Sequence, residues 1–178
     1  MNATRLCSLL QQGAVSWQLN GISLHGHVES LETTMRGVCV VEPGESKFWI
    51  APGKPENWAV AVASSTWGLG PTKEPRWNSI RSGDKLFFYV TSPISGVVGV
   101  GRITRKAIGH EPLWPREYEL DMVLYPLRFR FAVERLLDPS LWPTKAVSVS
   151  DLKASIRSMR PVDSGSAEVL YERVQHVC

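Results

Sequence analysis

The sequence predicts an α+β fold, a curved β-barrel of about five to six short strands with helices packed at its flanks. The strand-like runs of aromatic and β-branched residues are short and are interrupted by Gly and Pro. Few segments carry apolar residues at helical spacing. The chain has 178 residues and is 43% hydrophobic, which suits one globular domain plus an extension. Many short strands with few helices are typical of a small barrel.

The first regular elements follow residue 46. Residues 48–51 form an aromatic and β-branched run that Pro52 and Gly53 close, which predicts a strand. Residues 55–63 begin with proline and an acid and repeat apolar residues at three- and four-residue spacing, which predicts a short helix. We expect residues 65–71 to form a loop or a strand at a sheet edge.

The middle of the chain predicts a β-hairpin. Residues 77–80 are short and helical in character, and a tight turn then leads into a strand over residues 85–90. Residues 92–96 form the hairpin loop and residues 97–103 the returning strand. The glycines of this second strand weaken a flat sheet but permit the bend of a small barrel.

The last third of the chain mixes strand and helix. Residues 110–118 form a proline-flanked loop. Residues 127–133 alternate apolar and basic side chains, which predicts a half-buried strand with both of its arginines on one face. We expect one helix from about residue 150 to residue 159 and another from 166 to 174.

The N-terminal part, residues 1–46, keeps no helical or strand period, so we expect a poorly structured extension before a domain over residues 47–178. Met35 is a candidate start of the native chain, with residues 1–34 as an upstream over-extension. The apolar run at residues 6–10 is too short for an export signal, and no run approaches the roughly 20 residues that span a bilayer. We therefore expect a cytoplasmic protein without a membrane partner.

Composition argues against cofactors and favours a polyanionic partner. Cys7, Cys39 and Cys178 are far apart and odd in number, which predicts neither a disulfide framework nor a zinc site. The net charge is +3, and residues 47–135 hold 13 basic and 8 acidic residues, a local excess of +5. A basic segment of this kind fits nucleic acid.

Catalytic patterns are weak, so we expect no enzyme. The four histidines are scattered along the chain. Glu117, Glu119 and Asp121 alternate, and we interpret them as a charged loop rather than as an acid–base pair. Gly99 and Gly101 lie inside a predicted strand, whereas a phosphate-binding loop joins a strand to a helix.

An ordered series of short motifs resembles a known family. The motifs are Phe48-Trp49-Ile50, Glu56-Asn57-Trp58, Thr66-Trp67-Gly68, Ser82-Gly83-Asp84-Lys85-Leu86-Phe87-Phe88-Tyr89, Val97-Val98-Gly99-Val100-Gly101, Trp114-Pro115 and Tyr125-Pro126-Leu127-Arg128-Phe129. Their order and spacing over about residues 47–160 resemble the EVE domain, a PUA-like domain related to YTH domains. The resemblance implies a curved β-barrel with packed helices. It also implies binding of modified bases in DNA or RNA, as YTH domains bind N6-methyladenine in RNA.

The resemblance also implies a base-binding site. Trp67 and Trp114 match the two tryptophans of the YTH aromatic cage, so we expect two indole rings that face each other across a gap about one base thick. Gly68 would let the backbone approach the ligand. Asn57 matches a position that hydrogen-bonds the base edge. Two tyrosines are candidates for the pocket lining or for the core, namely Tyr89 and Tyr125.

Phosphate contacts would come from basic residues near these motifs. The candidates are Lys54, Lys73, Arg76, Arg81, Arg102, Arg105, Lys106, Arg116, Arg128 and Arg130, of which we favour Lys73, Arg76 and Arg128. The chain departs from the YTH pattern at Ala51, Pro52 and Gly53, where YTH domains carry Lys, Ser and Asn. This favours the EVE assignment, with the identity of the base open.

The sequence therefore predicts a non-catalytic nucleic-acid-binding module that holds a flipped, modified base, with methylation as the expected modification, in an aromatic cage. The alternative is a PUA-like RNA-binding accessory factor that grips tRNA or rRNA without selecting a modified base. A flipped base is required because a stacked base is inaccessible. We find no nuclease or ATPase motif in these residues and expect any effector to be a separate protein.

Overall fold

The computed structural model describes residues 18–19, 22–23, 46–150, 152 and 156–178. The chain divides into two units between Gly44 and Glu45. In the first unit, β1 (Gln18–Leu19) pairs antiparallel with β2 (Ile22–Ser23). The predicted N-terminal extension, residues 1–46, otherwise lies almost entirely outside the described residues.

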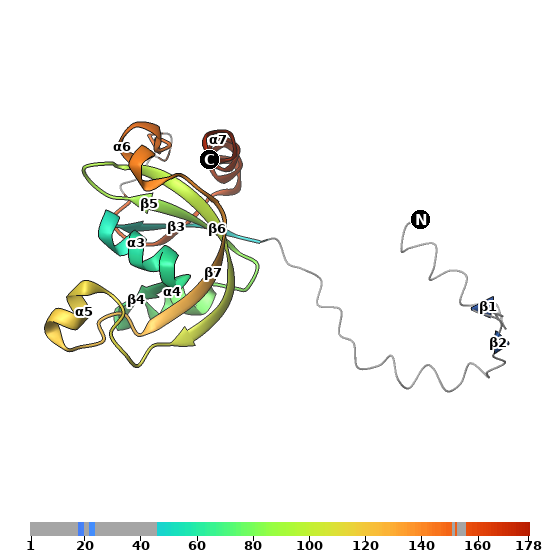
Figure 1. Ribbon diagram of the computed structural model, residues 1–178, viewed down its shortest axis with the longest axis horizontal. Helices are drawn as coiled ribbons and strands as arrows, with labels where there is room; N and C mark the ends of the chain where they lie inside the picture. Colours follow the sequence, from blue (N-terminus) through green and yellow to red (C-terminus); the bar gives the residue numbers. More distant parts are fainter. Residues whose placement is uncertain (1–17, 20–21, 24–45, 151, 153–155) are drawn as a thin grey trace. The chain divides into compact units, whose positions relative to one another are not determined.

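The second unit contains a six-stranded sheet with the strand order β4-β7-β6-β5-β3-β8 and helices packed on both of its faces (Figure 1). Its elements in chain order are β3 (Phe48–Gly53), α3 (Pro55–Ser64), β4 (Thr66–Leu69), η2 (Pro71–Lys73), α4 (Glu74–Ser79), β5 (Lys85–Val90), β6 (Gly96–Ile108), α5 (Pro115–Leu120), β7 (Leu127–Leu136), η3 (Pro139–Leu141), α6 (Trp142–Lys145), β8 (Arg160–Val162) and α7 (Ser164–Val177).

The sheet is curled into a half-barrel, which confirms the predicted curved barrel of five to six strands. β3 and β5 are parallel, and every other neighbouring pair is antiparallel. β6 carries two register shifts against β7, between Val100 and Gly101 and between Ile103 and Arg105. Bulges of this kind bend a strand and increase its twist. Gly101 allows close packing inside the bend, since a Cβ there would lie 2.6 Å from the Ala132 carbonyl oxygen.

The two faces of the sheet bury separate cores. Successive side chains of β5 point alternately into one core and into the other. Phe88 points into the larger core, which includes Trp58 of α3 and Phe129 of β7. Phe87 points to the other face and packs against the core that α7 covers. Lys85, Glu134 and Arg102 form an ion-pair cluster across β5, β6 and β7, with Nζ of Lys85 2.6 Å from Oε2 of Glu134. We refer to it as the Glu134 cluster.

Most predicted elements are confirmed, with changes in length. The strand at 48–51 and the helix at 55–63 appear as β3 and α3, and the last helix appears as α7. The strands predicted at 97–103 and 127–133 are longer, because β6 and β7 pair with each other from Gly99 with Leu136 to Ile108 with Leu127.

Two predictions fail. The proline-flanked loop at 110–118 contains the start of α5, where Pro115 occupies the first turn and Glu117 the third position. The helix predicted at 150–159 is wrong for the residues that the structure describes there, none of which is helical. No described helix is long and apolar enough to cross a membrane.

Candidate functional site

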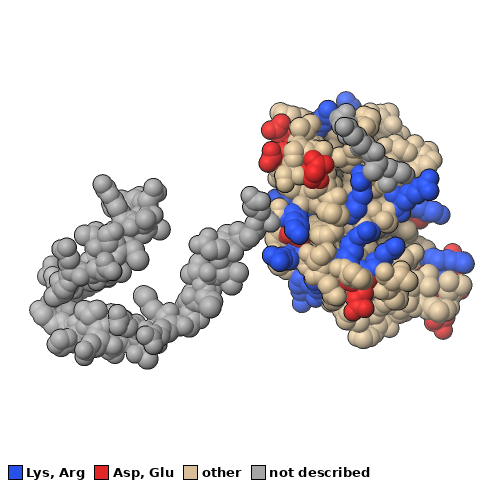
Figure 2. All heavy atoms as spheres, turned by 180° about the vertical axis from the view of Figure 1, so that it is seen from behind, with Lys and Arg blue, Asp and Glu red and all other residues tan. Residues whose placement is uncertain are grey.

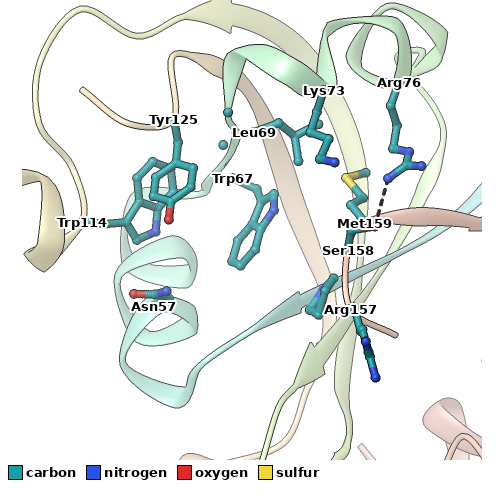
Figure 3. Close-up of a pocket in the computed structure, with 13 residues that line it drawn as sticks. Asn57, Trp67, Leu69, Lys73, Arg76, Trp114, Tyr125, Arg157, Ser158 and Met159 are labelled. Atoms are coloured by element: carbon teal, nitrogen blue, oxygen red, sulfur yellow. Dashed lines mark hydrogen bonds between the residues drawn. The ribbon is translucent and has the colours of Figure 1, made fainter. Parts of the chain in front are cut away.

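A cavity of about 210 Å³ opens at the end of the edge strand β4. Figure 3 shows an aromatic side formed by Trp67, Trp114 and Tyr125, and a cationic side formed by Lys73, Arg76 and Arg157. The remaining lining residues are Pro52, Asn57, Gly68, Leu69, Gly70, Ser158 and Met159. The cavity is smaller than the roughly 300–1,000 Å³ of drug-sized sites, so it suits one small ring system.

Trp67 is held from one side by a second indole. β4 turns its side chain toward the larger core, where it is only 7% exposed. One face of the ring stacks on Trp58, with centroids 4.2 Å apart and an interplanar angle of 20°. Gly53 makes room for the ring, because a Cβ at that position would lie 2.5 Å from Cη2 of Trp67. Trp67 therefore has only its other face to offer to a ligand.

Trp114 lies against the backbone of β4 at the start of α5. A Cβ at Gly68 would lie 2.6 Å from Cη2 of Trp114, so the ring occupies the space that a side chain would fill. Tyr125 meets Trp114 edge-on, with centroids 5.4 Å apart. The close approach expected between Gly68 and a ligand is thus made by Trp114 instead.

The two cage tryptophans do not face each other. The centroids of Trp67 and Trp114 are 6.3 Å apart and their planes meet at 77°, in an edge-to-face contact. The expected parallel pair with a base-wide gap is therefore wrong for this structure, because Trp67 is stacked on Trp58 and Trp114 is packed over Gly68. The rings instead form two adjoining walls of the cavity.

Their indole N–H groups separate these two rings from the other tryptophans. Of the six tryptophans in the described part of the chain, four donate the indole N–H to a protein acceptor, as a buried Trp usually does. These bonds run from Trp49 to Asp84 Oδ2, Trp58 to the Tyr89 carbonyl, Trp77 to the Arg128 carbonyl and Trp142 to the Leu137 carbonyl. Trp67 and Trp114 have no such partner among the described residues, and both line the cavity.

Glu117 fixes the segment that carries the aromatic side. Its side chain is fully buried, and its carboxylate accepts four backbone N–H groups. Oε2 accepts from Leu113 (2.7 Å) and Trp114 (3.3 Å), and Oε1 accepts from Leu124 (2.7 Å) and Tyr125 (2.8 Å). One carboxylate thereby joins both ends of the segment and sets the backbone of Trp114 and Tyr125. The sequence interpretation of a charged loop was wrong at this residue.

Arg128 supports the same segment and does not line the cavity. Its guanidinium lies 3.3 Å from Oε2 of Glu117 and 5.4 Å from the centroid of the Trp114 ring. It also donates to the carbonyls of Glu111 and Tyr125, and its side chain is 12% exposed. The expectation of a phosphate contact at Arg128 is not supported, because these partners already occupy the guanidinium.

Tyr89 is also placed away from the cavity. It lies on β5 and packs with Phe87 against the core beneath α7, on the opposite face from Trp67. The structure therefore separates Tyr89 from the other proposed base-binding residues, because side chains alternate along a strand.

The cationic side draws on three separate elements. Lys73 ends η2, Arg76 lies on α4 and Arg157 precedes β8. Nη1 of Arg76 donates to Oγ of Ser158 at 3.1 Å, which fastens residues 157–159 beside the cavity (Figure 3). No Asp or Glu belongs to the described lining. The sequence analysis missed Arg157, Ser158 and Met159, since no local pattern indicates that a C-terminal segment returns to β4.

Two polar groups in the cavity are placed to form new hydrogen bonds. Asn57, in the first turn of α3, has no hydrogen-bond partner for its amide within the described residues. On β4, the Phe131 N–H bonds the Ser65 carbonyl, and hydrogen-bonded pairs alternate in an antiparallel ladder. The N–H and C=O of Gly68, opposite Arg128, therefore point away from β7 toward the open edge of the sheet.

The described residues contain no group of three or more His, Cys, Asp or Glu side chains that could hold a metal ion. The chemistry that the site offers is stacking, hydrogen bonding and attraction of anions.

Solved structures of YTH domains share the fold of this chain. The Mmi1 YTH domain in complex with RNA has a TM-score of 0.53 at 14% identity, over 74% of this chain and 79% of that chain. The Mmi1 YTH domain alone has a TM-score of 0.53 at 16% identity, over 74% and 76%. Rpa0253 from Rhodopseudomonas palustris has a TM-score of 0.48 at 16% identity, over 74% and 95%. None of the curated proteins compared with the chain matches it.

The EVE domain family matches residues 47–173, which is more than half of the chain and covers every strand of the six-stranded sheet. The chain belongs to the EVE domain family.

Proposed function

We propose that this protein is a non-catalytic nucleic-acid-binding module that takes one flipped base into the cavity beside Trp67 and Trp114 and prefers a modified, methylated base. The observation that carries the proposal is the pair of tryptophans in the cavity whose indole N–H groups have no partner in the described part of the chain. Neither of these two indole nitrogens is fully buried, so both N–H groups can donate to a ligand in the cavity.

The corner between the two rings suits a base with an added methyl group. A base stacked on the open face of Trp67 would meet Trp114 with its edge, since the rings lie at 77°. Stacking on an aromatic side chain contributes about 1–3 kcal/mol per base. Burial of one methyl group adds about 0.8 kcal/mol, so the preference for a methylated base is expected to be about fourfold.

Edge recognition would come from Asn57 and Gly68. Each offers one donor and one acceptor to the cavity, and a base edge carries such groups. Lys73, Arg76 and Arg157 would contact the phosphates on the other side. A YTH domain of the same fold has been solved in complex with RNA, which supports a nucleic-acid partner.

The test compares two oligonucleotides that differ only in methylation of one base, by fluorescence anisotropy of a labelled strand. Trp67→Ala should remove the preference for the methylated strand and retain most of the salt-sensitive affinity. Trp77→Ala is the matched control, because Trp77 donates its N–H to the Arg128 carbonyl and does not line the cavity.

Equal affinity of the native protein for both strands, across the common base methylations, would contradict selective recognition. That result would favour the alternative, an accessory factor that binds tRNA or rRNA by its shape and charge. Loss of preference in Trp77→Ala but not in Trp67→Ala would show that the site is assigned to the wrong tryptophan.

A further inference from the structure

We infer that a second surface, on the outer face of β6 and β7, contacts the phosphodiester backbone of the nucleic acid whose base enters the cavity. This surface consists of Arg81, Arg105 and Arg130, and we call it the outer arginine cluster. The inference rests on the proposed function for its ligand, but it concerns residues that do not line the cavity.

The strand register brings two of these arginines together. Arg105 of β6 lies directly opposite Arg130 of β7. Phe129 and Phe131 are buried in the larger core, so Arg130 between them points to the outer face. Side chains opposite each other in an antiparallel pair have Cβ atoms about 4.5–5.5 Å apart. The two guanidinium groups therefore share one small area of the surface.

The third arginine comes from the turn before β5. Oγ of Ser82 donates to the Thr104 carbonyl, and the Gly83 N–H donates to the Ile103 carbonyl, both at 2.8 Å. These bonds hold the turn against β6 next to Arg105. Arg81 is therefore brought to the same end of the β6–β7 ladder.

The cluster has positive charge without compensation. All three side chains are exposed, and none forms an ion pair or a side-chain hydrogen bond within the described residues. Three residues earlier on β6, by contrast, Arg102 is paired with Glu134. Like charges directly opposite each other destabilise a sheet, so this arrangement is unfavourable in the free protein. An anion on the surface would relieve it.

The cluster is within reach of a strand that occupies the cavity. Gly68 lines the cavity and lies opposite Arg128, and Arg130 is two residues further along β7. At about 3.3 Å per residue, this separation is roughly 7 Å along the strand. The face drawn in Figure 2 carries many Lys and Arg side chains, and its acidic side chains form a few separate groups. Phosphates on either side of a bound base could therefore meet cations from both sites.

The experiment measures binding of a labelled single-stranded oligonucleotide of about ten nucleotides, carrying the modified base, over a range of salt concentrations. The variant is Arg105→Gln combined with Arg130→Gln. Each phosphate contact contributes about 0.7 to the slope of log affinity against log salt for a single strand, so the double variant should lower the slope by about 1.4. The control is Lys145→Gln, an exposed cation on α6, which should leave the slope unchanged.

Two further readouts separate this surface from the cavity. The melting temperature of the double variant should equal or exceed that of the native protein, because the like-charge contact is removed. The affinity ratio between modified and unmodified strands should stay as in the native protein. A ratio of one in the native protein, with the slope still reduced in the variant, would refute the proposed base selectivity and support the outer surface. An unchanged slope in the double variant would overturn the inference.

Discussion

Replacement of Glu117 by glutamine tests how the aromatic side of the cavity is held. The carboxylate accepts two backbone N–H groups on each oxygen, at the two ends of the segment from Leu113 to Tyr125. A glutamine in the same place has one oxygen and one NH₂ group, and the NH₂ group cannot accept a hydrogen bond. Two of the four backbone donors would therefore lose their acceptor while they remain buried.

The expected cost follows from these contacts. A buried donor without a partner costs about 1–3 kcal/mol, so two of them cost about 2–6 kcal/mol. Arg128 also loses its charged partner at 3.3 Å, which adds to the loss. Since domains are stable by about 5–15 kcal/mol, Glu117→Gln should be strongly destabilised. The Trp114 ring should also lose its fixed position in the Glu117→Gln variant.

Urea unfolding at pH 7 and near-UV circular dichroism measure the two effects. Glu119→Gln is the matched control on the same helix, because Glu119 is exposed and pairs only with Arg116 in a surface contact at 2.8 Å. That change should cost no more than about 0.5 kcal/mol. If Glu117→Gln lost no more stability than Glu119→Gln, the assignment of Glu117 as the anchor of the segment would be refuted.

Two further predictions concern the packing of the cavity and the response to acid. Gly68→Ala should lose about 1–3 kcal/mol of stability and weaken oligonucleotide binding, since its Cβ would lie 2.6 Å from the Trp114 ring. Gly70→Ala, whose Cβ would lie 3.6 Å from its nearest atom, should leave the stability unchanged, and equal losses of stability in denaturant melts would contradict this. Burial acts to raise the pKa of Glu134, but the hydrogen bonds and charges of the basic residues in the Glu134 cluster lower it below its ordinary value of 4.5. Because the pKa of Glu134 is lower in the folded protein than its ordinary value of 4.5, the ionised carboxylate stabilises the fold above pH 4.5. This stabilisation is lost as the pH falls through the lowered pKa of the folded protein, so the melting temperatures of the native protein and of Glu134→Gln should converge below pH 4.5. A gap that stayed constant with pH would argue against this role.

The strands that bury side chains on one or both faces were predictable from the sequence, because their pattern depends on local alternation. β3 and β5 follow directly from runs of aromatic and β-branched residues. The same alternation explains why Tyr89 lies away from the cavity: its neighbour Phe88 belongs to the larger core, so Tyr89 points to the other face. That conclusion was available from the strand period alone.

The motif resemblance selected residues that the fold brings together. Asn57, Trp67, Trp114 and Tyr125 come from separate elements and line one cavity with Lys73 and Arg76. It did not give their orientation, because the angle between two rings depends on packing partners such as Trp58 that are remote in the sequence.

Residues whose role depends on distant partners could not be predicted. In the sequence, Glu117 is one member of an alternating acidic run. Its burial depends on backbone donors up to eight residues away and on Arg128 from the next strand. Arg157 and its neighbours reach the cavity only because β8 pairs with β3, which places a late segment beside an early one. Local periodicity carries no signal for such pairings.

The indole N–H resonances of the tryptophans test the central claim most directly. In ¹H–¹⁵N spectra recorded during titration with a short oligonucleotide, the signals of Trp67 and Trp114, assigned with single Trp→Phe variants, should shift most. The indole signals of Trp49, Trp58, Trp77 and Trp142 should move little, since their N–H groups are bonded to the protein. Saturable binding that leaves the Trp67 and Trp114 signals in place would contradict a base in this cavity.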